Sequence, residues 1–170
     1  PAAVALAASQ GHATLPVLRP LRVAVFSSGN ELREPGTELA PGQIFDANRY
    51  QMLAWLAGMP VEVVSSECLP DNAAVTRERL QAASQQADVI LTSGGVRVGE
   101  EDHINPAVEQ LGTLGLWQIA MKPGKPFAYG QLRRGGGSAH FMGLPGNPVS
   151  SFVTFLLLVR PFLLKLQGAT

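Results

Sequence analysis

Short apolar runs rich in β-branched residues alternate along this 170-residue chain with longer stretches in which apolar residues have helical spacing. Glycine, proline or small polar residues separate the segments and end regular structure. Strands that alternate with helices predict an α/β fold with a three-layer, mostly parallel sheet and helices on both faces. The expected strands cover residues 21–27, 61–66, 88–93 and 114–121, and the expected helices cover residues 46–57, 71–86 and 103–111.

The last third of the chain predicts a β-hairpin followed by a helix. Residues 127–132 and 138–143 form the expected strand pair, and the three glycines of residues 135–137 form its tip. Asn147 then suits the N-cap of a helix that Pro148 begins. Polar residues interrupt the apolar stretch 149–166, which indicates a buried helix and not a membrane span.

The Ala-rich start, residues 1–20, indicates a linker from a preceding domain, and residues 21–170 form one domain. The missing initiator Met predicts that the chain is a piece of a longer protein. Thirteen basic and thirteen acidic residues balance, which argues against nucleic acid and an anionic membrane surface as partners. Cys68 is the one cysteine, so no intrachain disulfide forms; we expect a packing role for it and a cytoplasmic location.

Residues 93–102 (SGGVRVGEED) are the first candidate site. Ser93 ends an expected buried strand, and Gly94, Gly95 and Gly99 allow main-chain N–H groups to approach an anionic ligand closely. Acids close the segment, and Asp102 is placed to bind a metal or to act as an acid or base. The segment lacks the patterns of a phosphate-binding P-loop and of a dinucleotide site, which excludes both.

Four other loops follow expected strands, and ligands of open α/β sheets bind at the carboxyl ends of strands. They comprise residues 28–31, 70–71, 122–125 and 144–148. Lys122 and Lys125 flank a Pro-Gly turn and are placed to clamp phosphate or an oxyanion such as molybdate. The alternative is that both lysines are solvated surface residues.

The acids and the serine of these loops leave two interpretations open. Asp71 either caps the helix that follows or shares a hard cation with Asp102. Glu31 is either a solvated loop acid or part of the site. Ser150 lies in the first turn of the last helix, where its hydroxyl and N–H groups either hold an anion or face solvent. His103 and His140 are isolated, and packing or surface roles are expected for both.

Together these loops resemble the molybdopterin molybdotransferase family, and the chain is similar to the gephyrin E domain. The resemblance covers residues 21–168. The motifs that carry it occur in the family's order: SGNEL at residues 28–32, IFDAN at 44–48, SGGVRVGEED at 93–102, MKPGKP at 121–126 and GLPGNPVS at 143–150.

The resemblance implies a transferase that inserts molybdate into adenylylated molybdopterin and releases AMP. It implies that molybdate lies near Lys122, Lys125 and Ser150, and that Asp71, Asp102 and Glu31 are catalytic. The two aspartates would also bind Mg²⁺. It also implies a homodimer in the full-length protein, and a molybdopterin adenylyltransferase as a further partner. The molybdopterin-binding residues that it implies, besides those lysines and Ser150, are Ser93, Gly94, Gly95, Val96, Gly99, Pro145, Gly146 and Asn147.

Three positions depart from the family's pattern. Asn30 stands where Asp is common, Gln118 where some members have Lys, and Arg97 where Ser is usual. The changes at Asn30 and Gln118 leave open a molybdopterin-binding scaffold without turnover. A molybdopterin adenylyltransferase on the same fold is the second enzyme alternative, although the glycine loop at residues 94–99 favours the molybdotransferase. The family's members have further domains, so we expect this chain alone to be inactive.

Overall fold

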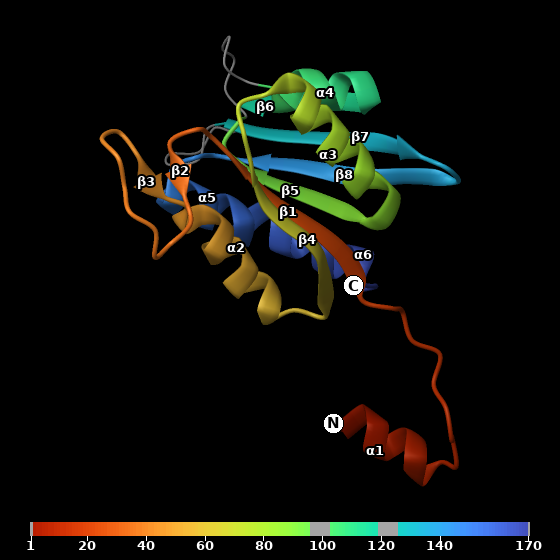
Figure 1. The fold of residues 1–170 in the computed structure, drawn as a ribbon. Coiled ribbons are helices and arrows are strands. Elements are labelled where there is room, and N and C mark those ends of the chain that lie inside the picture. Colours follow the sequence, from red (N-terminus) through yellow and green to blue (C-terminus); the bar gives the residue numbers. More distant parts are fainter. Residues whose placement is uncertain (1, 96–102, 119–125, 170) are drawn as a thin grey trace.

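A computed structural model describes residues 2–95, 103–118 and 126–169, and it has an α/β architecture (Figure 1). One sheet has six strands in the order β4-β1-β5-β8-β7-β6. These strands are β1 (Leu21–Ser28), β4 (Val61–Leu69), β5 (Val89–Ser93), β6 (Gly112–Gln118), β7 (Pro126–Arg134) and β8 (Gly137–Leu144). The helices are α1 (Ala2–Ser9), α2 (Ala47–Ala57), α3 (Ala73–Gln86), α4 (Ile104–Leu111), α5 (Pro148–Thr154), the π-helical η1 (Phe155–Val159) and α6 (Arg160–Leu166).

The strand directions confirm a mostly parallel sheet with one C-terminal hairpin. β4, β1, β5 and β8 pair in parallel, whereas β7 pairs antiparallel with both β8 and β6. Two antiparallel pairings in succession give β6 the direction of β8. The carboxyl ends of β1, β4, β5, β6 and β8 therefore lie at one edge of the sheet, as the sequence predicts for its candidate loops.

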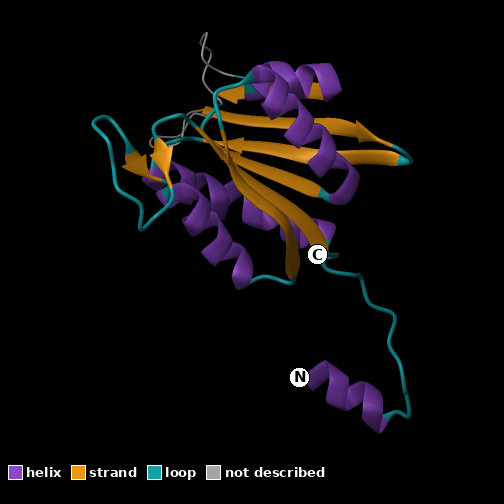
Figure 2. Cartoon of the chain, in the orientation of Figure 1, coloured by secondary structure: helices purple, strands orange, loops and turns teal. Residues whose placement is uncertain are grey.

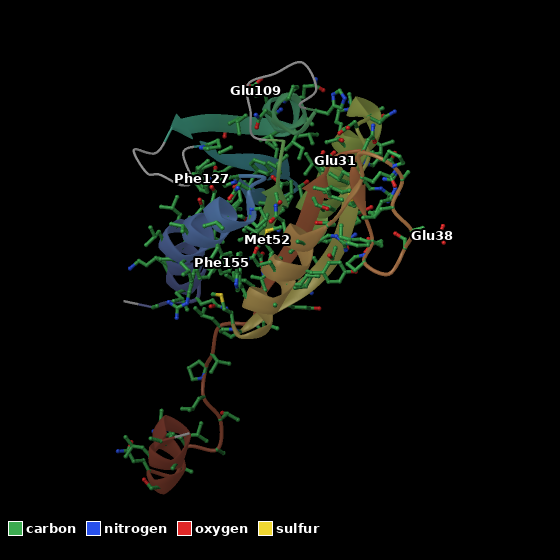
Figure 3. The ribbon with its side chains drawn as sticks, turned by 90° about the vertical axis from the view of Figure 1, so that its left-hand side faces the viewer. Glu31, Glu38, Met52, Glu109, Phe127 and Phe155 are labelled. Atoms are coloured by element: carbon green, nitrogen blue, oxygen red, sulfur yellow. The ribbon has the colours of Figure 1, made fainter. Side chains whose placement is uncertain are left out.

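Two hydrophobic layers enclose the sheet, which gives the expected three-layer arrangement (Figure 2). On one face Phe26 and Phe141 pack with Leu80 of α3 and Val108 of α4. On the other face Val25 and Leu91 join Met52 of α2 and Phe155 of η1, and Figure 3 shows these last two side chains in that layer. Successive residues of a strand point to opposite faces, so a strand with helices on both sides is apolar throughout.

Several boundaries differ from those that the sequence predicts. β4 continues to Leu69, because its partner β1 offers pairing as far as Ser28. α4 begins at Ile104, with Pro106 in its first turn, where a missing N–H breaks no helical hydrogen bond. The loop between β1 and α2, expected without strands, contains the short parallel pair β2 (Leu32–Arg33) and β3 (Ile44–Phe45).

The last helix is only partly covered, with 33% of it buried, which corrects the expectation of a buried helix. Phe155, Val159 and Leu163 pack against the sheet, but the side chains of Leu156 and Leu157 are exposed. The π turn η1 lies just before Pro161, whose ring nitrogen has no hydrogen to donate to the preceding turn. Pro148–Leu166 is long and apolar enough to cross a membrane, a weak indication that core helices of soluble proteins also give.

The start of the chain stands apart from the sheet (Figure 1). α1 was expected as part of a linker; its alanines favour a helix, yet it buries no residue. Residues 12–20 form neither helix nor strand. Arg19 anchors the end of this segment, because its guanidinium binds both carboxylate oxygens of Asp88 at 2.6 and 2.7 Å.

Candidate functional site

The main chains of three candidate loops meet at the carboxyl edge of the sheet. Gly94 donates its N–H to the carbonyl of Leu144 at 3.1 Å, which joins the end of β5 to the end of β8. A Cβ atom at Gly94 would lie 3.2 Å from the carbonyl oxygen of Ser28, and one at Gly146 would lie 3.8 Å from the Cα of Gly94. This close approach requires glycine at position 94 and leaves a cradle made of backbone.

Gly95 shapes the exit from β5. Its φ of +64° lies in the left-handed region, and a Cβ there would lie 2.6 Å from the Cδ1 atom of Ile104. Ile104 is fully buried and has no room to move aside. The second glycine thus brings the start of α4 close against the strand end, as a tight strand-to-helix connection requires.

Glu31 and Asp71 both lie at this edge, but Asp71 does not cap the helix after it. Asn72 caps α3, because its side chain accepts from the N–H of Val75 at 3.0 Å. Asp71 instead accepts from the N–H of Asn30 at 3.0 Å, and Asn30 Oδ1 accepts from the N–H of Asp71 at 3.2 Å. The carboxylate of Glu31 folds back over Gly29.

The reciprocal pair gives Asn30 a structural role. Its main-chain and side-chain groups join the loop after β1 to the loop after β4. One oxygen of Asp71 is used in this bridge, while the other makes no hydrogen bond within the described residues. Asp71 is exposed, so that second oxygen is accessible to solvent.

Asn147 confirms the predicted N-cap of the last helix, with its side chain 3.0 Å from the N–H of Ser150. Ser150 is 8% exposed, so it does not face solvent. The cap occupies the Ser150 N–H, and an anion would therefore have to bind the hydroxyl of that residue. Pro145 is buried beside it, whereas Gly146 is exposed.

A buried polar network under the loop after β1 escaped the sequence predictions. Asp46 caps α2, and its carboxylate also accepts from the hydroxyl of Ser27 and from the Nε of Arg49 at 2.9 Å. Ser27, Asp46 and Arg49 are 0%, 1% and 6% exposed. A buried ion pair of this kind fixes geometry more than it adds stability. The only signal in the sequence is an acid three residues before an arginine at a helix start.

The network reaches the surface through Glu34, which binds the guanidinium of Arg49 and the hydroxyl of Tyr50. Burial opposes the charge of Arg49, but its hydrogen bond to Asp46 and the nearby carboxylates raise its pKa overall. The hydrogen bond to Glu34 raises the pKa of Tyr50. Burial raises the pKa of the Cys68 thiol, which disfavours a thiolate there.

Asn48 links this network to the cradle. Its side-chain amide, in the first turn of α2, donates to the carbonyl of Gly146 at 2.7 Å. Its Oδ1 atom is buried and has no hydrogen-bond partner in the described structure. The ends of β1 and β8 are thus held together by main-chain and side-chain contacts from three loops.

Five predicted site residues lie outside the described residues: Val96, Gly99, Asp102, Lys122 and Lys125. Within the described ranges, no group of three or more His, Cys, Asp or Glu side chains gathers as a metal site. The described residues therefore contribute one candidate metal ligand, Asp71. A single carboxylate is compatible with Mg²⁺, which is commonly bound by one or two carboxylates plus substrate phosphates.

The fold and the cradle define a class: an α/β domain with a glycine-lined backbone cradle at the carboxyl edge of a mostly parallel sheet. Residues 24–165 match the family described as "Probable molybdopterin binding domain". The chain belongs to this molybdopterin-binding domain family.

Named relatives extend the comparison. The chain is 47% identical over 168 residues to the molybdopterin molybdenumtransferase of Haemophilus influenzae, which covers 99% of the chain and 41% of the relative. It is 30% identical to the gephyrin of Dictyostelium discoideum over 86% of the chain and 24% of that protein. The chain thus spans less than half the length of these relatives.

Solved structures of molybdenum and tungsten cofactor biosynthesis proteins share this fold. A molybdopterin biosynthesis moeA protein from Pyrococcus horikoshii superposes with a TM-score of 0.80 at 34% identity, over 96% of this chain and 40% of that one. A tungsten cofactor synthesizing protein MoaB from Pyrococcus furiosus has a TM-score of 0.62 at 15% identity, over 89% of this chain and 98% of that one. At that identity the second likeness shows the fold alone.

Proposed function

We propose that this chain is the molybdopterin-binding domain of a molybdotransferase, an enzyme that inserts molybdate into adenylylated molybdopterin and releases AMP. The observation that carries the proposal is the 47% identity to the Haemophilus molybdenumtransferase across 99% of the chain. The cradle of Gly94 and Gly146 at the strand ends supports it, because main-chain N–H groups beside glycines bind anionic groups such as phosphates.

Each candidate residue has a role in this proposal. The main chain around Gly94, Gly95 and Gly146 holds the phosphate side of the molybdopterin. Lys122 and Lys125 attract molybdate by charge, with the hydroxyl of Ser150 as a neutral donor. Asp71 and Asp102 act where the adenylate is cleaved, and Glu31 lies at the same edge of the sheet.

The proposal includes a Mg²⁺ ion bound at the candidate site. The second carboxylate oxygen of Asp71, together with Asp102, would hold it. When bound, it would neutralise negative charge on the substrate phosphates. The Asn30 bridge holds the Asp71 carboxylate in place for this role whether or not the metal is present.

The test is molybdate-dependent AMP release from adenylylated molybdopterin by the full-length gene product. We expect Asp71→Asn and Asp102→Ala each to reduce turnover at least 100-fold, since each removes a charged group from the reacting site. A Glu38→Gln variant is the matched control, because Glu38 lies in the same exposed loop as Glu31 but away from the cradle (Figure 3).

Each alternative function gives a different result in this assay. Formation of the adenylate from ATP and molybdopterin, without AMP release on addition of molybdate, would support an adenylyltransferase instead. Binding of molybdopterin with neither reaction would support a scaffold. Unchanged AMP release in both aspartate variants would remove the catalytic assignment.

A further inference from the structure

Asn48 joins the start of α2 to the cradle by a contact between distant parts of the chain. Its side-chain Nδ2 atom donates a hydrogen bond of 2.7 Å to the main-chain carbonyl of Gly146, a residue 98 positions further along. Gly146 forms one wall of the cradle, because a Cβ atom there would lie 3.8 Å from the Cα of Gly94. The bond therefore fixes a part of the main chain that lies next to Gly94.

The start of α2 is a firm support for this bond. Asp46, two residues before Asn48, accepts a hydrogen bond from the hydroxyl of Ser27 in β1 and another from the Nε of Arg49 at 2.9 Å. Ser27, Asp46 and Arg49 are all buried. Asn48 thus extends towards Gly146 from an element that is tied to the end of β1.

The side chain of Asn48 also carries a cost for the fold. Its Oδ1 atom is buried and has no hydrogen-bond partner within the described structure. A buried acceptor without a partner destabilises a protein, and an apolar group of the same shape in its place is close to neutral or stabilising. Gly146 is exposed, so water would satisfy its carbonyl if the Asn48 amide were absent. An asparagine here is therefore better explained by a role in the site than by stability.

The hydrogen bond determines which way one peptide group points. In a planar trans peptide the N–H lies opposite the carbonyl, so fixing the carbonyl of Gly146 also fixes the N–H of Asn147. That N–H points away from Asn48 and makes no hydrogen bond within the described residues. Asn147 is exposed, which leaves its N–H as a main-chain donor for a ligand. Main-chain N–H groups of this kind bind anionic groups.

We propose that Asn48 is a positioning residue, which locks the peptide between Gly146 and Asn147 in the orientation that presents the Asn147 N–H to an anionic group of the ligand. Without the bond the peptide is able to rotate, because glycine tolerates backbone conformations that other residues do not. Asn48 acts through the main chain and does not itself touch the ligand. The inference rests on the proposed function for the identity of that ligand, adenylylated molybdopterin.

The test replaces Asn48 by leucine, which keeps a branched side chain of similar shape but lacks the donor, and by alanine. Equilibrium binding of adenylylated molybdopterin to the full-length gene product, without molybdate, gives the Kd. Both variants should raise the Kd about 10-fold, which corresponds to the loss of one hydrogen bond to a charged group. For Asn48→Leu the melting temperature of the 170-residue chain should stay within about 3 °C of the wild-type value, because the lost bond and the removed buried oxygen have opposite effects on stability.

Gln51→Leu is the matched control for Asn48→Leu. Gln51 lies about one turn further along α2, is half-buried like Asn48, and makes no hydrogen bond in the part of the chain that the structure describes. The substitution removes the same amide group from the same helix without releasing Gly146. It should change the Kd by less than about 2-fold.

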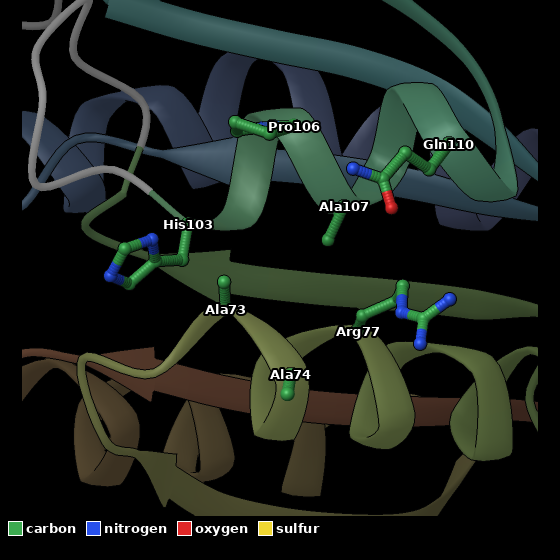
Figure 4. Close-up of a pocket in the computed structure, with 7 residues that line it drawn as sticks. All are labelled: Ala73, Ala74, Arg77, His103, Pro106, Ala107 and Gln110. Atoms are coloured by element: carbon green, nitrogen blue, oxygen red, sulfur yellow. The ribbon is translucent and has the colours of Figure 1, made fainter.

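Amide resonances of the 170-residue chain without ligand report on the peptide directly. Asn48→Leu should shift the amide resonance of Asn147, because the carbonyl of the same peptide loses its donor. Ala74 and Gln110 supply the reference resonances, because they line a pocket between α3 and α4, on the opposite face of the sheet from α2 (Figure 4). Their amide resonances should not move.

Three results would overturn the inference: an unchanged Kd in both Asn48 variants, an equal rise of the Kd in Gln51→Leu, or a melting temperature of Asn48→Leu lowered by clearly more than about 3 °C, which would indicate a merely structural role. The amide shift separates this inference from the proposed function. A wild-type protein that binds no adenylylated molybdopterin would refute the proposed function, whereas an unmoved Asn147 resonance would refute the role of Asn48 even if the full-length gene product released AMP.

Discussion

At the scale of single residues, Asp88 is the most heavily bonded carboxylate in the described structure. It accepts two hydrogen bonds from Arg19, one from the N–H of Arg22 at 2.9 Å and one from Arg134 at 3.4 Å. The Arg19 bond is the main reason that the pKa of Asp88 lies well below its usual range, and burial only partly opposes it. Asp88 lies just before β5, at the end of that strand remote from the cradle, so its role is structural.

Asp88→Asn should lower the free energy of unfolding at pH 7 by about 1 to 2 kcal/mol, because hydrogen bonds to a charged group contribute about that much and Arg19 is partly screened by solvent. A lowered folded-state pKa gives stability that is complete above the unfolded pKa of about 3.9 and is lost as pH falls below it. Urea unfolding at pH 7 and pH 3 should show a smaller gap between wild type and variant at pH 3. An equal difference in unfolding free energy between wild type and variant at both pH values would contradict a stabilising role for the Asp88 charge.

The buried pair of Asp46 and Arg49 gives a second prediction. Asp46→Ala removes a helix cap and leaves the buried guanidinium of Arg49 without its buried partner. We expect a loss of about 3 kcal/mol, since breaking a buried ion pair costs more than losing a cap. Asn72→Ala removes only a cap, on α3, and should cost about 1 kcal/mol. Equal losses in urea unfolding would show that the ion pair contributes nothing.

At the scale of elements, Gly95 controls how β5 passes into α4. Gly95→Ala should destabilise the protein by about 2 kcal/mol more than Gly36→Ala, because overpacking a rigid site costs about 1 to 3 kcal/mol. Both glycines have positive φ, so both variants carry the same kind of backbone strain. A Cβ at Gly36 meets no atom within 4 Å, whereas one at Gly95 meets Ile104. Similar melting temperatures for the two variants would refute the steric argument.

The helices and strands that could be predicted are those whose formation depends on the local sequence pattern. The buried strand β5 and the hairpin β7–β8 follow from β-branched runs and glycine turns, and Asn147-Pro148 marks a helix start on its own. The pair β2–β3 was not predictable, because two-residue strands carry no pattern of their own and depend on a partner twelve positions away. The π turn η1 lies next to Pro161, but the apolar spacing of this stretch does not distinguish a π turn from an α-helix. The described strand-end loops, at residues 28–31, 70–71, 93–95 and 144–148, lie at one edge as predicted. The Asn30–Asp71 bridge joins positions 41 residues apart and has no local signature.

At the scale of the whole molecule, the described part of the candidate site is open to solvent. Glu31, Asn30 and Asp71 are exposed, and so are the apolar side chains of Val149, Phe152 and Leu157 on the last helix. The chain covers 41% of the Haemophilus relative. We therefore propose that other parts of the full-length gene product, which we expect to be a homodimer, complete the site.

This gives the last prediction: the 170-residue chain alone should bind its ligand but release AMP at less than about 1% of the full-length rate. Binding needs only the cradle and its neighbours, whereas catalysis needs water excluded from the reacting groups and each charge held in position. Asp71 is held in position by Asn30, but its carboxylate is exposed, so water is not excluded from it in the described structure. The measurement is single-turnover AMP release, with the chain and the full-length gene product at equal concentrations. Equal rates would mean that this domain contains every group the reaction requires.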